Sequence, residues 1–282
     1  MNVPNRAALI SKTHKVLKKH WRPVQPQSDR TVLEHMLYAC CLENSLHQEA
    51  DDAFANLLES YFDWNEIRVT TTRELASAMS GLSDSIDAAK RLKATLQSVF
   101  ETHYSFDLGF YRKQNLGKAI KEFERLKGVT PFSIGYLVQN ALAGHAIPVN
   151  ESALQALYVL GIVTEAEAKK RLTPGLERAI PKSKGVEFAS LLHSVGVDFS
   201  KSPFSTNVRA ILLEIAPDAK ERLPKRPSKK AKPVTKKSAT TAKKASTKAS
   251  PTRKTKKVAK KTAAPPKKKT SSSRTLKRKK PR

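Results

Sequence analysis

The last part of this chain cannot build a hydrophobic core. Residues 222–282 contain 26 Lys or Arg residues and no Asp, Glu, Phe, Trp or Tyr. A segment so poor in apolar groups cannot offset its ordering entropy, which is about 1 to 2 kcal/mol per residue for the backbone alone. We therefore expect a folded part over residues 1–221, followed by a disordered basic tail that is rich in Lys, Ala, Thr and Pro.

The charge of the chain is concentrated in this tail. All 25 acidic residues lie in residues 1–221 beside 27 basic ones, so the folded part carries a net charge of +2 and the tail supplies +26 of the total of +28. Duplex DNA presents about one negative charge per 1.7 Å, so 26 cations match roughly 44 Å of duplex. The composition is similar to that of linker-histone tails. Lysines without aromatic residues contact phosphates and carry no sequence information, so sequence-independent binding to DNA is expected.

Other partners of the tail stay open. RNA, heparin and acidic lipid attract Lys-rich segments in the same way, and a role in solubility or localisation alone is the plainest interpretation. No stretch of about 20 apolar residues is present, so no transmembrane helix and no membrane partner are expected. The N-terminus lacks the apolar core of a signal peptide. We expect a cytoplasmic, nucleoid-associated protein, or a nuclear one in a eukaryote.

The sequence predicts neither a metal site nor a cofactor. The two cysteines, Cys40 and Cys41, are adjacent in a helical segment, and neighbours on a helix point about 100° apart. This arrangement favours buried reduced thiols over a disulfide or a metal site. His145 and His193 are isolated in the sequence and are interpreted as ordinary hydrogen-bonded groups.

Residues 1–221 have the periodicity of an all-helical protein. Apolar residues at three- and four-residue spacing predict helices over residues 31–46, 72–79, 85–103, 116–126, 131–143 and 152–160. The stretch 164–216 is expected to consist of shorter helices, because prolines and glycines interrupt it at positions 174, 181, 185, 196 and 203.

Residues 118–163 resemble the helix-hairpin-helix core of the endonuclease III superfamily of DNA glycosylases. Leu126, Gly128 and Val129 match the family's hairpin of the form LPGVG, and Ile147 and Val149 match its later IPVDTHV-like stretch. The resemblance covers roughly residues 28–195. It implies a two-lobed, all-helical glycosylase-like fold over residues 1–221, with DNA as the partner and base-excision repair as the family's process.

The residues of the hairpin predict a phosphate-binding turn independently of the family resemblance. A tight turn between two helices leaves backbone N–H groups unpaired, and these can bind a phosphate oxygen. Gly128 allows close approach of the backbone, and Thr130 followed by Pro131 predicts the start of the second helix. The alternative is a connection that binds nothing. The residues expected to contact DNA are Lys127, Gly128, Val129, Thr130 and Ser133.

The catalytic positions of the family hold other side chains here. The resemblance places the family's Lys nucleophile at Phe132 and its Asp at Asn150. Phe132 has no nucleophilic atom, and Asn150 offers a neutral amide where a charged group is required. The four cysteines of the family's iron–sulfur cluster are also missing, since residues 193–221 contain none. The primary hypothesis is a DNA-binding protein without glycosylase or lyase activity, that is, a pseudoenzyme.

Two further functions stay open. Glu151 lies one position beyond Asn150 and is the candidate carboxylate of an active monofunctional glycosylase, in which Glu151→Gln would abolish base release. In the other alternative, the folded part is a protein-interaction module and only the tail contacts nucleic acid. The sequence predicts neither the preferred lesion nor the oligomeric state.

Overall fold

The computed structural model describes residues 5–225; residues 1–4 and 226–282 lie outside the described residues. The predicted disordered tail therefore falls almost entirely outside them. All regular structure within residues 5–225 is helical, as the sequence predicted. Within the same range, no helix combines the length and the apolar character that a membrane crossing requires.

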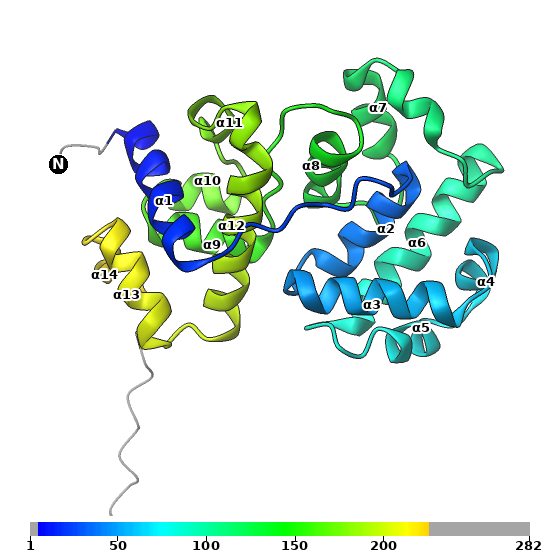
Figure 1. Cartoon of the computed structure of the whole chain (residues 1–282), viewed down its shortest axis with the longest axis horizontal. Helices are drawn as coiled ribbons and strands as arrows, with labels where there is room; N and C mark the ends of the chain where they lie inside the picture. The colour runs from blue at the N-terminus through cyan, green and yellow to red at the C-terminus, as the bar shows by residue number, and fades with distance from the viewer. Residues whose placement is uncertain (1–4, 226–282) are drawn as a thin grey trace, which may run out of the picture. The chain divides into compact units, whose positions relative to one another are not determined.

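The helices form two lobes, each with its own apolar core (Figure 1). The first lobe is contiguous in sequence, and its core extends from Val32 to Leu137. It consists of α2 (Val32–Leu42), α3 (His47–Ser60), α4 (Trp64–Val69), α5 (Thr72–Ala78), α6 (Ser85–His103), the 3-10 helix η1 (Gly109–Lys113), α7 (Leu116–Phe123) and α8 (Pro131–Asn140).

The second lobe combines both ends of the described chain. Helix α1, which the sequence did not predict, packs against α11, α12 and α13. Residues 21–31 then cross from this lobe to the first one, and residues 141–150 return (Figure 1). The members of the second lobe are α1 (Arg6–His20), α9 (Glu151–Val159), α10 (Glu165–Lys169), α11 (Leu176–Ala179), α12 (Lys182–Lys201), α13 (Thr206–Ile215) and α14 (Ala219–Arg222).

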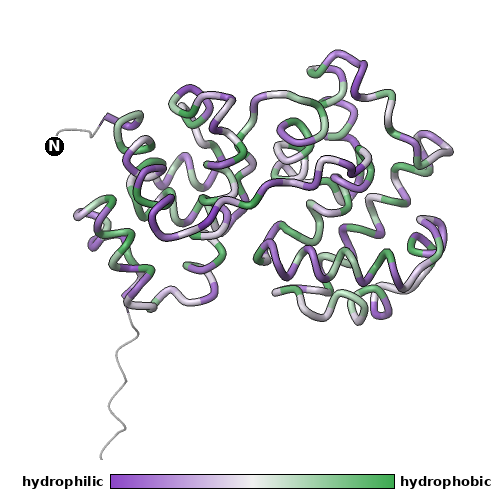
Figure 2. The backbone as a smooth tube through the Cα atoms, viewed as in Figure 1, coloured by the Kyte–Doolittle hydropathy of each residue, from purple (hydrophilic) through white to green (hydrophobic). Residues whose placement is uncertain are grey.

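Helix α2 is the central element of the first lobe. It begins with a capping box, in which the Thr31 hydroxyl accepts from the N–H of Glu34 at 3.2 Å and the Glu34 carboxylate accepts from the N–H of Thr31 at 2.6 Å. Every residue of α2 except Glu34 is buried. Figure 2 shows that apolar and polar residues alternate along the helices of both lobes, as expected for helices with one buried face.

The two cysteines are buried and free in α2, as the sequence predicted. Burial raises the pKa of Cys40 to about 11, so its thiol stays protonated at neutral pH. Because Cys40 and Cys41 are the only cysteines of the chain, they cannot supply the four thiolates of an iron–sulfur cluster.

Helix α12 corrects the prediction for the C-terminal part. Gly185 and Gly196 were expected to interrupt helices, but both lie inside this helix of 20 residues. A Cβ atom at position 196 would lie 2.6 Å from the backbone nitrogen of Ala153 in α9. Gly196 thus permits close packing of α12 on α9, and this tertiary contact outweighs the low helix propensity of glycine.

Candidate nucleic-acid interface

The predicted hairpin is a short connection between α7 and α8. Helix α7 ends at Phe123, three residues before the predicted end, and α8 begins at Pro131. The Thr130 hydroxyl accepts a hydrogen bond from the N–H of Ser133 at 3.1 Å. Thr130 is therefore the N-cap and Pro131 the first helical residue, as predicted.

The hairpin turn, residues 126–130, rests on helix α6. Gly128 has a φ of +86°, and a Cβ atom there would lie 2.4 Å from the carbonyl oxygen of Arg91 and 2.7 Å from the hydroxyl of Thr95. The N–H of Lys127 donates to the hydroxyl of Ser98 at 3.1 Å. Glycine is thus required at position 128 because the turn packs against α6. From the sequence, the same glycine was predicted to allow the close approach of a phosphate instead.

The turn contains backbone N–H groups that are free of partners among the described residues. Among the residues that the structure describes, none accepts a hydrogen bond from the N–H groups of Gly128, Val129 or Thr130. These three residues are partly exposed, and the side chain of Lys127 beside them is exposed. Consecutive free N–H groups in front of a helix N-terminus form a site that suits an anion.

Ser133 differs from the other predicted contact residues. It is buried, and its hydroxyl lies 3.1 Å from the Thr130 hydroxyl. Its N–H donates to the same hydroxyl. Ser133 therefore fixes the cap of α8, while the other four residues form the exposed turn.

A carboxylate that sequence reasoning missed holds this turn in place. Glu43 follows the last residue of α2, and its carboxylate accepts from the Thr130 hydroxyl at 2.9 Å and from the guanidinium of Arg91. Arg91 also donates to the carbonyl oxygen of Cys40 at 3.2 Å, and the Asn150 amide donates to the carbonyl oxygen of Glu43. Glu43 thus connects α2, α6, the turn and the start of α9.

Glu43 is largely removed from water. Its side chain and that of Arg91 are each 14% exposed. Burial raises the pKa of Glu43, while Arg91 and the Thr130 hydroxyl lower it in part. Both partners hold the carboxylate toward the turn, so its role is to position the hairpin.

Beside the turn lies a cleft of about 290 Å³, here called the hairpin cleft. Phe132 and Asn150, which the sequence resemblance matches to the Lys and Asp positions of the glycosylases, both line it. Phe132 is 3% exposed and Asn150 is 2% exposed. The Asn150 side chain accepts from the N–H of Ala153 at 2.9 Å and caps α9. Within the described residues, the lining of this cleft contains no lysine.

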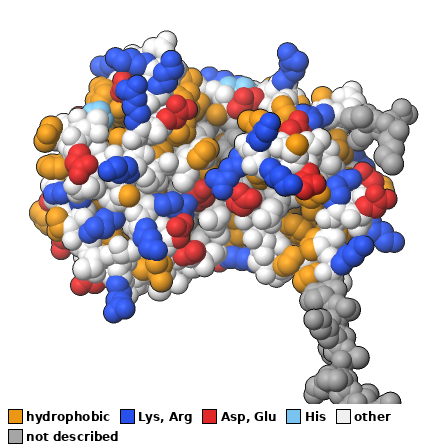
Figure 3. Space-filling view, turned by 180° about the vertical axis from the view of Figure 1, so that it is seen from behind, with side chains coloured by type: hydrophobic (Ala, Val, Ile, Leu, Met, Phe, Trp, Pro, Cys, Tyr) orange, Lys and Arg blue, Asp and Glu red, His pale blue; other side chains and the backbone are white. Residues whose placement is uncertain are grey.

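The hairpin cleft contains charges of both signs. Glu151 lines it with a side chain that is 53% exposed, and its carboxylate forms an ion pair with Arg171 at 3.4 Å. Glu43 and Arg91 are paired in the same cleft. Figure 3 shows acidic and basic side chains intermixed on one face of the molecule, which agrees with the net charge of +2 for residues 1–221.

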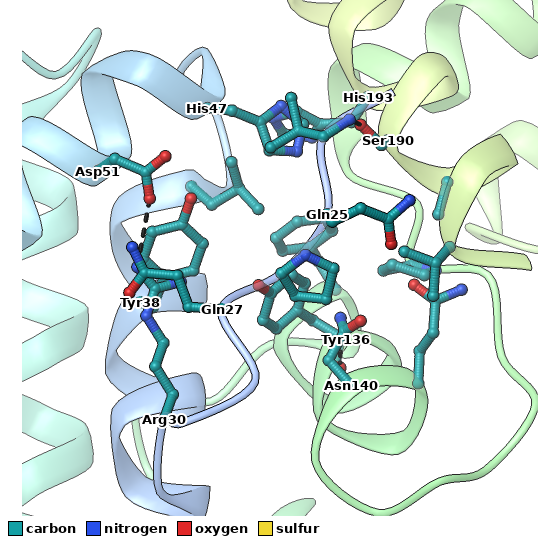
Figure 4. Close-up of a pocket in the computed structure, with 18 residues that line it drawn as sticks. Gln25, Gln27, Arg30, Tyr38, His47, Asp51, Tyr136, Asn140, Ser190 and His193 are labelled. Atoms are coloured by element: carbon teal, nitrogen blue, oxygen red, sulfur yellow. Dashed lines mark hydrogen bonds and ion pairs between the residues drawn. The ribbon is translucent and has the colours of Figure 1, made fainter. Parts of the chain in front are cut away.

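A second cavity of about 130 Å³ lies among α2, α3, α8, α12 and residues 24–27 (Figure 4). We call it the aromatic cavity, because Tyr38, Phe132, Tyr136, His47 and His193 line it. The guanidinium carbon of Arg30 lies 3.7 Å from the centre of the Tyr38 ring, and Arg30 donates to the Asp51 carboxylate at 3.2 Å.

His193 is a hydrogen-bonded group, as the sequence predicted, and it is buried in a cluster of rings. Its Nε2 lies 2.8 Å from the carbonyl oxygen of Ser45, and its ring centre lies 5.0 Å from that of His47 and 5.7 Å from that of Phe132. The partners come from α3 and α8, so no local sequence pattern could reveal this cluster. Among the described residues, no three His, Cys, Asp or Glu side chains come together as a metal site.

Burial keeps three histidines of the protein neutral. It lowers the pKa of His193 from 6.5 to about 3 and that of its neighbour His47 from 6.5 to about 4. Burial likewise lowers the pKa of His35 from 6.5 to about 4, and the nearby cations Arg30 and Arg112 contribute to this decrease. His35 and His193 are at most 3% exposed.

The free energy of unfolding is therefore expected to decrease below about pH 6.5. In the unfolded chain all three histidines take up protons near that pH, whereas the folded protein excludes these protons down to about pH 4 for His35 and His47 and about pH 3 for His193. Stability falls where the unfolded state binds more protons, and three such groups give a loss of up to about 6 kcal/mol between pH 7.5 and pH 5. Urea unfolding at both pH values measures this loss. His193→Gln should remove about a third of the dependence, and equal stability at both pH values would contradict the assignment.

No protein-family model and no curated protein sequence matches the chain. A solved non-covalent endonuclease III–DNA complex is 14% identical, with a TM-score of 0.53 over 77% of this chain and 98% of that one. A trapped endonuclease III–DNA covalent intermediate is also 14% identical, with a TM-score of 0.52 over 79% of this chain and 100% of that one. Together with the helical lobes and the hairpin, these matches show that the described part of the chain has the fold seen in these endonuclease III structures.

Proposed function

We propose that this protein binds DNA through the hairpin turn and the basic tail, and that it does not break glycosidic bonds. The observation that carries the proposal is the row of three free N–H groups at Gly128, Val129 and Thr130 beside the exposed Lys127. Such N–H groups donate hydrogen bonds to a phosphate oxygen, and these contacts carry no information about the base sequence. The solved structures of the same fold named above are complexes with DNA, which favours DNA over RNA as the partner.

The absence of catalysis rests on the groups around the hairpin cleft. The ring of Phe132 cannot attack a sugar carbon, and the Asn150 amide is occupied by the cap of α9 and by the carbonyl oxygen of Glu43. The carboxylate of Glu43 is held by Arg91 and Thr130. Glu151 is half exposed and paired with Arg171, so its carboxylate is directed to a cation rather than to a bound sugar.

The tail supplies affinity for DNA that does not depend on the DNA sequence. Its 26 cations over residues 222–282 provide many phosphate contacts, and each contact releases condensed counterions. The protein would then be a factor that associates with the nucleoid, or with chromatin in a nucleus. In this proposal the turn gives the folded part a defined position on the duplex, and the tail increases the total affinity.

A trapping experiment tests the proposal directly. Full-length protein is incubated with duplexes that carry uracil, an oxidised pyrimidine or an abasic site, with and without borohydride, and binding to each duplex is measured by fluorescence anisotropy. We expect binding to every duplex, no released base and no covalent adduct. An adduct or a released base would refute the non-catalytic role, and an unchanged anisotropy on all duplexes would refute DNA binding.

A further inference from the structure

The hairpin cleft and the aromatic cavity are separate, and one residue separates them. Phe132 is the only residue that lines both. The cleft is otherwise lined by residues around the turn and the start of α9, such as Thr130 and Asn150. The cavity is otherwise lined by residues of α2, α3, α8 and α12, such as Tyr38 and His193. The ring of Phe132 therefore forms the wall between the two spaces.

The ring of Phe132 packs against two other aromatic residues that line the aromatic cavity. The Phe132 ring is stacked on His193, with an interplanar angle of 28°, and its centre lies 6.3 Å from that of Tyr136. His193 is fixed in turn by its hydrogen bond to the carbonyl oxygen of Ser45. The stack on His193 and the contact with Tyr136 oppose movement of the Phe132 ring, and its side chain is 3% exposed.

The aromatic cavity has the chemistry to hold one flat heterocycle. Rings surround it, and the polar side chains of Gln25, Asn140 and Ser190 also line it. Its volume of about 130 Å³ is close to that of a cavity of about 150 Å³ that admits benzene. A base of DNA bound at the turn would approach it from the hairpin cleft, since Thr130 and Pro131 of the turn line that cleft.

We propose that Phe132 determines which form of DNA this protein binds, namely duplex in which every base stays stacked. The inference rests on the proposed function. Turning a base out of a duplex costs unstacking and unpairing energy, which only contacts in a receiving pocket can offset. The ring of Phe132 blocks the route from the hairpin cleft to the aromatic cavity, so a base of DNA bound at the turn gains no such contacts by leaving the stack.

The experiment uses a duplex with a single 2-aminopurine, whose fluorescence rises when the base leaves the stack. One duplex has the probe paired with thymine, and a second has it in a mismatch, where eversion costs less. With full-length wild-type protein we expect the fluorescence of both duplexes to stay at the level of the free duplex. With Phe132→Ala, which joins the two spaces, we expect a severalfold increase on the mismatched duplex.

Phe132→Leu is the matched control, because it keeps an apolar wall of nearly the same reach, and we expect it to behave like the wild type. Circular dichroism melting confirms that each variant is folded. A fluorescence increase with wild-type protein would overturn the proposal even if Phe132→Ala does not fold. An unchanged signal with folded, bound Phe132→Ala would overturn the role of Phe132. Anisotropy on the same duplexes reports binding separately, so a failure of DNA binding is distinguished from a failure of this inference.

Discussion

Raising the salt concentration from about 50 to about 200 mM is expected to weaken DNA binding by the full-length protein about 10³- to 10⁵-fold. This range corresponds to about 6 to 10 neutralised phosphates, and the 26 cations of residues 222–282 exceed that number. Anisotropy titrations at several salt concentrations give the slope of log K against log salt. A flat salt response would contradict any role of the tail in binding.

A truncated protein separates the tail from the hairpin turn. The cut belongs after Lys225, because Leu223 is buried and Arg222 donates to the carbonyl oxygen of Val159 at 2.8 Å. Residues 1–225 should still bind at low salt, with a much smaller slope, and Lys127→Ala should reduce that slope by about 1. Lys15→Ala on α1 removes the same charge elsewhere and should leave the slope unchanged. If residues 1–225 bind no DNA at low salt, the folded part is not a DNA reader and the tail is the only contact.

Glu43→Ala is expected to lower the free energy of unfolding by about 3 kcal/mol. The substitution leaves the guanidinium of Arg91 without its partner in a site that is 14% exposed, and it leaves the Thr130 hydroxyl without an acceptor. Removal of one member of a buried pair costs more than the pair contributes, because the remaining charge stays poorly hydrated. Urea unfolding at neutral pH measures the change.

Two further variants sharpen this test. Glu43→Gln keeps the shape and an acceptor for Thr130 but loses the charge, so its loss should be smaller. Glu59→Ala on α3 removes an exposed carboxylate that has no partner among the described residues and should change stability by less than about 0.5 kcal/mol. If Glu43→Ala is as stable as Glu59→Ala, the network around the turn does not hold the fold together.

The sequence predicted the elements whose determinants are local. The cap at Thr130, the start of α8 at Pro131 and the buried run of α2 depend on neighbouring residues and on helical periodicity. The fold could be predicted because a family resemblance supplied the arrangement of these helices. Helix ends were less accurate, since α7 and α8 each end three residues before the predicted position.

The features that the sequence did not predict depend on distant partners. Glu43 meets Arg91, Thr130 and Asn150, which lie 48, 87 and 107 residues away, and nothing around Glu43 in the sequence indicates these contacts. The stack of Phe132 on His193 likewise joins α8 to α12. Gly196 was taken for a helix breaker because only the packing of α9 explains its presence.

The placement of α1 among α11, α12 and α13 has a consequence for biosynthesis. Residues 32–140 complete their own core, so this lobe can condense while the ribosome still extends the chain. The other lobe needs Ile10 and Leu17 together with Leu212 and Leu223. Helix α1 therefore has no packing partners until nearly all of the folded part has been translated. A nascent chain arrested before that point should expose the apolar face of α1 to chaperones.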